Sequence, residues 1–190
     1  LYSKFEIEDI FINFGSGAFF HNKWKNYDYP GQTNYYKNIQ GLPEKDFYPI
    51  TEKEELLELR KFKQELLGNR PNDFVLLYVN RNIRRKMVGD CLLAFQQFVN
   101  QLPPEKRSRV TYVMHTQPVD NNGTDLPKLI EHLMPEVNVV FSHQKLNNKQ
   151  MNYLYNIADV TMNIASNEGF GLGTCESLMA GTPIIVNVTG

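Results

Sequence analysis

Several features that this sequence lacks narrow its class before any motif is considered. Its 190 residues include two cysteines, Cys91 and Cys175, which stand far apart in apolar surroundings and form no metal-binding spacing. Two lone cysteines make no disulfide framework, which favours a reducing compartment. No apolar run approaches the roughly 18 residues of a membrane span, and no secretory leader is recognisable. We therefore expect a cytoplasmic location, with peripheral membrane association left open.

An excess of charge of one sign is also missing. The formal net charge is −1, so no general basic surface indicates a nucleic-acid partner. The hydrophobic content of 42% and the charged content of 22% are ordinary for a globular protein. The length allows one good core, or one domain plus part of another. Because the chain starts at Leu1 and stops where a strand is expected to end, we expect it to be a fragment of a longer protein.

The composition divides the chain into three segments. Residues 1–41 are rich in Asn, Gly and Tyr without a clear period, and we interpret them as the remnant of a preceding domain. Residues 42–72 are predicted to form a linker followed by an amphipathic helix. That helix is expected to begin with Thr51 as its N-cap and to end at Gly68. Residues 73–190 form the remaining domain.

Strand and helix patterns alternate along this last domain. Short apolar runs predict strands at 74–80, 109–116, 138–142, 159–165 and 183–188. Helical spacing predicts helices at 86–102, 124–134, 147–158 and 173–181. The alternation predicts an α/β fold, a Rossmann-like parallel sheet with helices on both faces. Because right-handed crossovers bring all strand carboxyl ends to one edge, we expect ligand-binding residues in the loops at that edge. These loops are 80–85, 117–123, 143–146 and 166–172.

One of these loops is unusual in its glycines. The segment "SNEGFGLGTCESLMAG" has two glutamates, Glu168 and Glu176, with three glycines between them, directly before a helix. Each glycine weakens regular structure by roughly 0.5–1 kcal/mol relative to alanine. A bare backbone at a helix N-terminus is suited to a phosphate or pyrophosphate ligand. The alternative is a plain strand-to-helix turn whose glycines serve packing. A nicotinamide site is not favoured, because the dinucleotide fingerprint follows the first strand and has a different spacing.

A second loop carries a cluster of positive charge. The segment "NRNIRRK" places four cations within six positions after the first predicted strand of the sheet. Arginine offers bidentate contacts to phosphate, and lysine a point charge. Two anion-binding segments on one edge suit the two ends of a diphosphate, and we expect this role of Arg81 and Lys86 before Arg84 and Arg85. The alternative is a solvated charged turn.

Together these segments resemble the retaining glycosyltransferases of the family 4 type, which have the GT-B fold. "NEGFGLGTCESLMAGTPIIV" resembles their E-x7-E segment, and "VNRNIRRK" resembles their arginine-to-lysine loop. "LPEKDFYPI" resembles the linker into their donor domain. The resemblance covers about residues 42–190. It departs at Asn80 and Met87, where the family commonly has glycine.

The resemblance implies a fold and an activity. Residues 73–190 would be the C-terminal donor domain of a GT-B fold, and 1–41 the remnant of its acceptor-side domain. The protein would transfer a sugar from a nucleotide-diphosphate sugar to an unknown acceptor, whether glycan, lipid or protein, with retention of configuration. Neither a cofactor nor a divalent metal would be needed.

The resemblance also implies roles for individual residues. Arg81 and Lys86 would bind the donor diphosphate and offset charge on the leaving group, and Glu168 would hold hydroxyls of the donor sugar. These three form the predicted catalytic set. Substrate-binding roles fall to Gly169, Phe170, Gly171, Leu172, Glu176 and Arg85. Among these, Glu176 would bind the nucleotide ribose, and the base would rest near 141–146.

Two other functions fit the same residues. A phosphorylase or epimerase acting on sugar phosphates would share the fold, and product analysis with and without an acceptor would separate it. A non-catalytic module that binds nucleotide sugars would keep the pocket without transfer.

Overall fold

The computed structural model describes residues 45–69, 72 and 74–187, so the segment 1–41 lies outside the described residues. The helices are α1 Lys53–Leu67, α2 Val88–Gln101, α3 Pro104–Arg107, α4 Leu126–Leu133, α5 Asn148–Asn156 and α6 Leu172–Met179, with a 3-10 turn, η3, at Arg84–Lys86. The strands are β1 Phe74–Val79, β2 Val110–His115, β3 Val139–Phe141, β4 Val160–Asn163 and β5 Ile184–Val186.

The five strands form one parallel sheet in the order β3-β2-β1-β4-β5. Strand order reverses between β1 and β4, because the chain moves from β1 outward to β2 and β3 and then returns to the other side of β1. This reversal is the topological switch point, where parallel sheets bind ligands beyond their strand carboxyl ends. The predicted fold class is confirmed.

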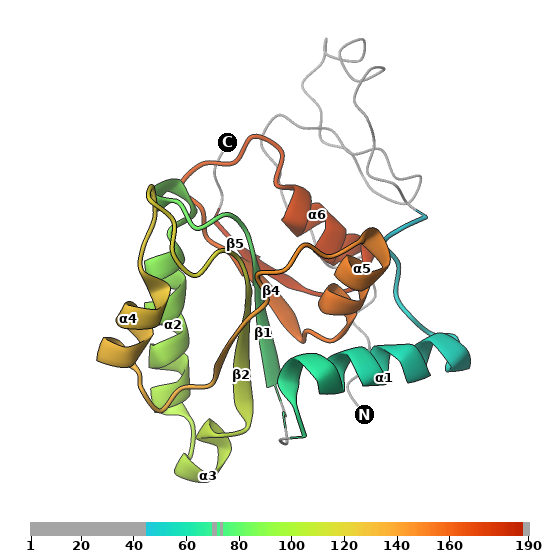
Figure 1. Cartoon of the computed structure of the whole chain (residues 1–190), viewed down its shortest axis with the longest axis horizontal. Coiled ribbons are helices and arrows are strands. Elements are labelled where there is room, and N and C mark those ends of the chain that lie inside the picture. Colours follow the sequence, from blue (N-terminus) through green and yellow to red (C-terminus); the bar gives the residue numbers. More distant parts are fainter. Residues whose placement is uncertain (1–44, 70–71, 73, 188–190) are drawn as a thin grey trace.

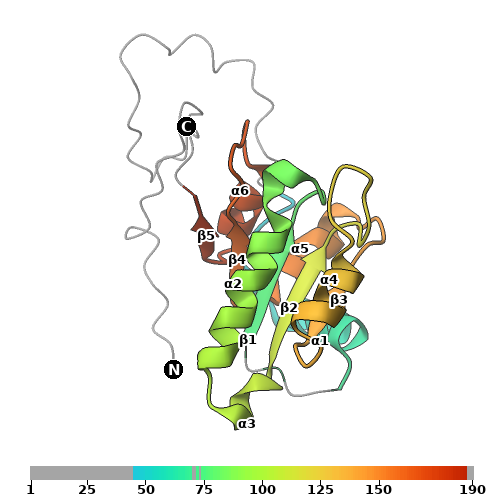
Figure 2. The same cartoon turned by 90° about the vertical axis from the view of Figure 1, so that its left-hand side faces the viewer.

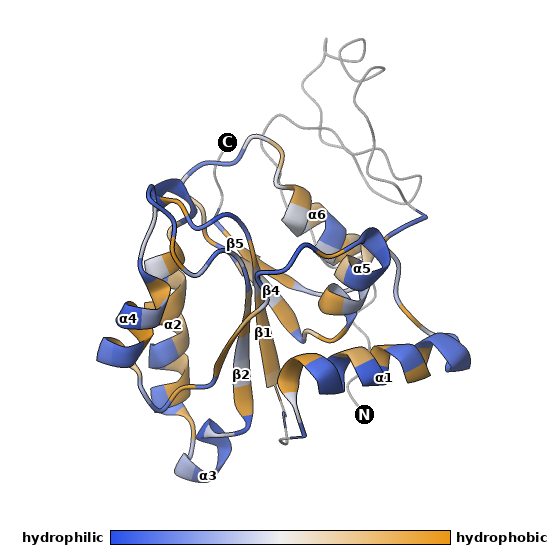
Figure 3. Cartoon of the chain, in the orientation of Figure 1, coloured by the Kyte–Doolittle hydropathy of each residue, from blue (hydrophilic) through white to orange (hydrophobic). Residues whose placement is uncertain are grey.

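Helices cover both faces of the sheet. Figures 1 and 2 show α2 and α4 on one face, and α1, α5 and α6 on the other. The side chains of β1 alternate between the two faces: Leu76 and Tyr78 join the core under α2 and α4, whereas Val75 and Leu77 join the core on the opposite face. Because both of its faces are buried, the central strand β1 is almost continuously apolar, as the hydropathy colours of Figure 3 show.

Helix ends follow the sequence signals at some sites and not at others. Asn147 caps α5 through a capping box with Gln150. Gly68 ends α1 with a positive φ of 73°, as expected. The prediction of Thr51 as N-cap of α1 is wrong, because the residue before α1 is Glu52, whose side chain makes no capping hydrogen bond.

The linker explains where α1 begins. The backbone N–H of Tyr48 donates to Asn152 (3.1 Å), and that of Ile50 donates to Asn156 (2.9 Å), so α5 holds this segment in place. Glu52 is still extended, with a ψ of 134°. Contact with α5, rather than a capping side chain, therefore decides the start of the helix.

Two smaller features were not foreseen. The four-residue helix α3 lies between α2 and β2. β5 lies at an edge of the described sheet, and Ile185 at its centre is 46% exposed rather than buried.

Among the described helices, none combines the length and the apolar composition needed to cross a bilayer.

Candidate functional site

The loop after β1 is fixed by the buried side chain of Asn82. Its amide donates to the carbonyls of Thr124 (2.6 Å) and Gln117 (3.1 Å), and its side-chain oxygen accepts the N–H of Thr124 (3.0 Å). A Cβ on Gly123 would lie 2.1 Å from the carbonyl oxygen of Asn82, so only glycine fits there. These contacts join the loops after β1 and β2 into one unit.

The same loop then turns sharply into α2 at Met87. Met87 has a φ of 49°, and among the described residues it alone of the non-glycines has a positive φ. This left-handed conformation costs roughly 1–2 kcal/mol for a residue with a Cβ. It is the position where the resembled family commonly has glycine. Lys86, directly before it, is buried.

Cations from the loop after β1 meet the first glutamate of the glycine turn. The amine of Lys86 donates to Oε1 of Glu168. The guanidinium of Arg85 lies 3.4 Å from Oε2 of the same carboxylate and also donates to the carbonyl of Asn167. The backbone N–H of Ser166 donates to the carbonyl of Arg85 (3.0 Å). The ends of β1 and β4 are therefore connected at the switch point.

Asn163, the last residue of β4, links the parts of this cluster. Its amide donates to Glu168 (2.9 Å) and to the hydroxyl of Thr174 in α6 (3.0 Å). Its side-chain oxygen accepts from the amide of Asn80, directly after β1 (3.1 Å). Asn163 is buried, so it holds the carboxylate, the glycine turn and the cationic loop in a fixed relation.

These contacts keep Glu168 charged. Partial burial raises the pKa of its carboxyl, but the hydrogen bonds from Lys86 and Asn163 and the charges of Lys86 and Arg85 outweigh burial and hold the pKa below its usual value. An ionised carboxylate with 19% of its side chain exposed can accept hydroxyl groups from a ligand.

The three glycines of the turn serve different purposes. Gly171 precedes α6 with a φ of 71°, a left-handed conformation that favours glycine. A Cβ on Gly173 would lie 3.1 Å from the carbonyl oxygen of Val79, so this residue permits close packing of α6 on β1. Gly169 is exposed, and a Cβ there would meet nothing within 4 Å. Packing thus explains Gly173, but it leaves Gly169 unexplained.

The second glutamate lies in α6 and is held from α5. Oε2 of Glu176 accepts the hydroxyl of Tyr155 at 2.7 Å. Burial raises the pKa of Glu176, and the hydrogen bond from Tyr155 offsets part of that rise. The two glutamates of the motif therefore have opposite pKa shifts, which arise from different partners.

Arg81 is not part of this cluster. Its guanidinium binds Asp120 in the loop after β2, with Nε 2.9 Å from Oδ2. The Arg81 side chain is 62% exposed. The structure thus brings together Lys86, Arg85 and Glu168, and it turns Arg81 towards the neighbouring loop.

Comparison with known proteins identifies the family. Residues 60–190 match the family described as "Glycosyl transferases group 1". The chain belongs to the group 1 glycosyltransferases.

This chain is also similar to individual glycosyltransferases, in sequence or in structure. The alpha-monoglucosyldiacylglycerol synthase of Acholeplasma laidlawii is 31% identical over 149 residues, which are 77% of this chain and 34% of that protein. The chain thus spans about a third of the length of this curated relative. The C-terminal domain of a group 1 glycosyltransferase (LpcC) from Francisella tularensis superposes with a TM-score of 0.57 at 17% identity, covering 77% of this chain and 70% of that domain.

A third comparison extends the fold to a longer protein. Anabaena HepE, solved in complex with UDP-glucose, superposes with a TM-score of 0.60 at 21% identity, over 79% of this chain and 37% of HepE. At these identities the structural likeness shows the fold alone. That fold is the Rossmann-like C-terminal domain of the GT-B glycosyltransferases.

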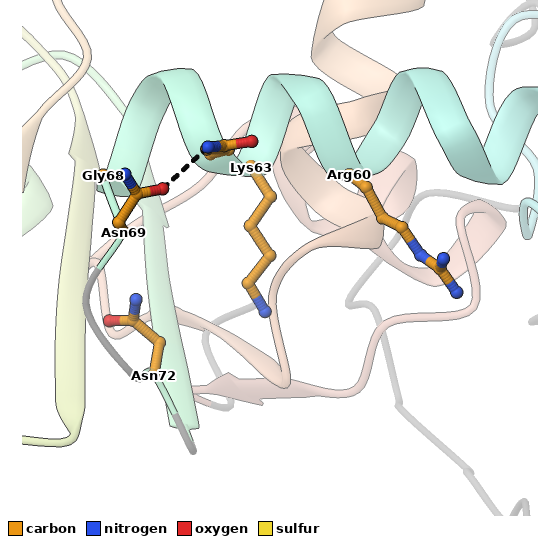
Figure 4. A pocket seen from close by; sticks show the side chains of 6 residues that line it. Arg60, Lys63, Gly68, Asn69 and Asn72 are labelled. Atoms are coloured by element: carbon orange, nitrogen blue, oxygen red, sulfur yellow. Dashed lines mark hydrogen bonds between the residues drawn. The ribbon is translucent and has the colours of Figure 1, made fainter.

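The described part of this glycosyltransferase chain holds no cluster of three or more His, Cys, Asp or Glu residues that could bind a metal. A cavity of about 230 Å³ lies beside α1 and includes Arg60, Lys63 and Asn72 among its lining residues (Figure 4). It lies next to the start of β1, at the opposite edge of the sheet from Glu168. None of the predicted site residues lines it.

The region expected to receive the base lies beyond β3. Ser142 there shares a hydrogen bond with Nδ1 of His115 at the end of β2 (3.0 Å). Burial lowers the pKa of His115. This pair lies on the far side of β1 from Glu168, because β2 and β4 flank β1 on opposite sides.

Sequence reasoning missed three residues that organise the site: Asn82, Asn163 and Tyr155. Asn163 and Asn82 had a usable signal, because a polar residue at the carboxyl end of an apolar strand, or a few residues after it, lies at the ligand edge. Tyr155 had no such signal, since a tyrosine on an amphipathic helix is usually a core residue.

Proposed function

We propose that this chain is the donor-binding part of an enzyme that transfers a hexosyl or other sugar from a nucleoside diphosphate to an acceptor, with retention of anomeric configuration. Family membership and the GT-B donor-side fold support the reaction class. The observation that carries the proposal is the meeting of Lys86, Arg85 and Glu168 beside the glycine turn that leads into α6.

The charges at this point suit the leaving group. Breaking the bond between the anomeric carbon and the diphosphate oxygen gives an oxocarbenium-like transition state and a developing anion. Lys86 and Arg85 would supply positive charge to that anion, and the first N–H groups of α6 would supply hydrogen-bond donors. Arg85 is available because 45% of its side chain is exposed. Arg81 would join them only by leaving Asp120.

Glu168 fits a binding role better than a nucleophilic one. Its carboxylate is engaged by Lys86, Arg85 and Asn163, which stabilise the charge and weaken it as a nucleophile. We propose that it accepts hydroxyls of the donor sugar, with the backbone of 169–172 lying alongside. The acceptor hydroxyl would attack the face that the diphosphate leaves, its oxygen bonding to the anomeric carbon while its proton passes to the departing phosphate oxygen.

A transfer assay tests the proposal. The protein that contains this chain is incubated with radiolabelled UDP-glucose, ADP-glucose or GDP-mannose and with diacylglycerol or glycan acceptors; diacylglycerol is included because the curated relative is named for a glucosylated diacylglycerol. We expect labelled glycoside with the donor's anomeric configuration by NMR. Glu168→Gln should lower the rate by about 100-fold or more. A hydrogen bond to a charged group contributes about 1.5–3 kcal/mol, and the rate falls further because the donor sugar is no longer held in position.

Other outcomes identify the alternatives. Sugar phosphate formed from the product in the presence of inorganic phosphate indicates a phosphorylase. Tight binding of nucleotide sugars without turnover on any acceptor indicates a non-catalytic module.

We propose that charge from Lys86 and Arg85 replaces a divalent cation. EDTA should therefore leave the transfer rate unchanged. A rate that EDTA abolishes and Mg²⁺ restores would contradict the proposal of metal independence.

A further inference from the structure

Tyr155 places one of the two glutamates of the site. We propose that Tyr155 is a positioning residue that fixes the carboxylate of Glu176 for recognition of the nucleotide ribose, and so sets the preference of this protein for ribonucleotides over 2′-deoxyribonucleotides. This inference rests on the proposed function, because it assumes a nucleoside diphosphate at the switch point.

Tyr155 is rigid enough to position another group. Its side chain is fully buried in the core on the α5 face, and its ring packs edge-on against Phe47 at 5.9 Å between centroids. Its backbone carbonyl accepts the hydroxyl of Thr182 at 2.7 Å. The hydroxyl of Tyr155 therefore has a fixed place, and it uses that place to donate to Oε2 of Glu176 at 2.7 Å.

This hydrogen bond leaves the other half of the carboxylate available. Among the described residues, Oε1 of Glu176 has no hydrogen-bond partner, and the residue is only partly buried. A carboxylate with one oxygen held and the other open can accept a hydroxyl of a diol, whereas an unrestrained glutamate would lose side-chain entropy on doing so.

The tyrosine also ties Glu176 to the phosphate end of the site. A Cβ on Gly173 would lie 3.4 Å from the Tyr155 hydroxyl and 3.1 Å from the carbonyl oxygen of Val79. The hydroxyl thus lies against the first turn of α6, where the diphosphate is proposed to bind. Glu176 can recognise the ribose only if its carboxylate lies at a fixed distance from the bound diphosphate.

Stability alone does not account for this pair. Burial raises the pKa of Glu176, which means that keeping a carboxylate at this position opposes folding at neutral pH. A neutral acceptor would satisfy the tyrosine hydroxyl without that penalty. A charged acceptor retained at such a cost is typical of binding sites.

Calorimetric titration tests the inference. UDP, ADP and GDP are titrated first, and the tightest of them is then compared with its 2′-deoxy form on wild type and on Tyr155→Phe, which keeps the ring. We expect wild type to prefer the ribonucleotide by about tenfold, and Tyr155→Phe to reduce that preference to threefold or less. Tyr153→Phe is the matched control, because Tyr153 also lies on α5 but donates to Glu58 on α1 (2.6 Å). It should keep the tenfold preference.

The ratio of the two affinities distinguishes a loss of positioning from general destabilisation, because a less stable protein binds the ribonucleotide and the 2′-deoxyribonucleotide more weakly by the same factor. Glu176→Gln should lower the preference as well, and Tyr155→Phe should add nothing in that background. The inference is overturned if wild type shows no preference, if Tyr155→Phe leaves the ratio unchanged, or if the two substitutions act independently. Failure of all three nucleoside diphosphates to bind wild type would instead refute the proposed function, and this inference with it.

Discussion

The amine of Lys86, which follows β1, donates to the carboxylate of Glu168, which follows β4, across the switch point of the sheet. The two residues are 82 positions apart in the chain. Their pairing places a buried cation directly beside the glycine turn, and Asn163 fixes the same carboxylate from β4. This arrangement should therefore affect both the stability of the protein and its binding of ligands.

Two glycines of the turn should respond differently to the same substitution. Gly173→Ala places a Cβ 3.1 Å from the carbonyl oxygen of Val79, and we expect a loss of about 1–2 kcal/mol in the free energy of unfolding. Gly169→Ala meets no atom within 4 Å, so its stability should stay within about 0.5 kcal/mol of wild type. Urea denaturation measures both. Gly169→Ala should nevertheless weaken binding of nucleotide sugars, since its backbone is proposed to lie against the sugar; unchanged binding would argue against that placement.

The ion pair of Glu168 should give the stability a defined pH dependence. Because the pKa of Glu168 is lower in the folded protein than its ordinary value of 4.5, its contribution is complete above that value and disappears as the pH falls through the folded-state pKa. Glu168→Gln should therefore be less stable than wild type by about 1–3 kcal/mol at pH 7. Urea midpoints between about pH 6 and pH 3 should show this difference shrinking with acidity. A difference that stays constant over this range would contradict the assignment.

Arg81 should matter less than Lys86 for diphosphate binding. Its guanidinium is bound to Asp120 and is mostly exposed, whereas Lys86 is buried at the glycine turn. We expect Arg81→Ala to weaken binding of a nucleoside diphosphate by less than about threefold, or 0.7 kcal/mol. Asp120→Asn, which releases Arg81, is the informative partner variant. If Asp120→Asn tightens binding several-fold, Arg81 reaches the phosphates after all.

The fold was largely predictable because its signals are local. Short apolar runs and helical spacing appear within a few residues of sequence, and they located the central strands and α5. The start of α1 was not predictable from Thr51, since it depends on hydrogen bonds to Asn152 and Asn156 about 100 positions away.

The site was predictable in its location but less so in its contacts. The glycine turn and the cationic loop were placed on one edge by topology, and the structure brings Lys86 and Glu168 together there. Of the arginines, Arg85 joins them, whereas Arg81 binds Asp120. Asp120 lies in the loop after β2, and the sequence pattern does not specify the course of this loop.

Met87 shows how the local preference of a residue and the folded structure can differ. The sequence departs from the resembled family by lacking glycine after the lysine, and the structure shows Met87 in the left-handed conformation that glycine adopts most readily. Met87 therefore adopts a conformation that is unfavourable for a residue with a Cβ. Topology and burial of Lys86 hold it there, and local propensity does not.

The central claim is that Lys86 and the N-terminus of α6 bind a pyrophosphate, and a comparison of nucleotides tests it most directly. The tightest of UDP, ADP and GDP is titrated beside its monophosphate on wild type, Lys86→Met and Lys63→Met, the last being a lysine at the opposite edge of the sheet.

We predict that Lys86→Met lowers the affinity for the diphosphate by at least about tenfold, or 1.4 kcal/mol. Its affinity for the monophosphate should change less than twofold, and Lys63→Met should match wild type for both. Equal losses for the two nucleotides, or an unchanged diphosphate affinity in Lys86→Met, would contradict the account.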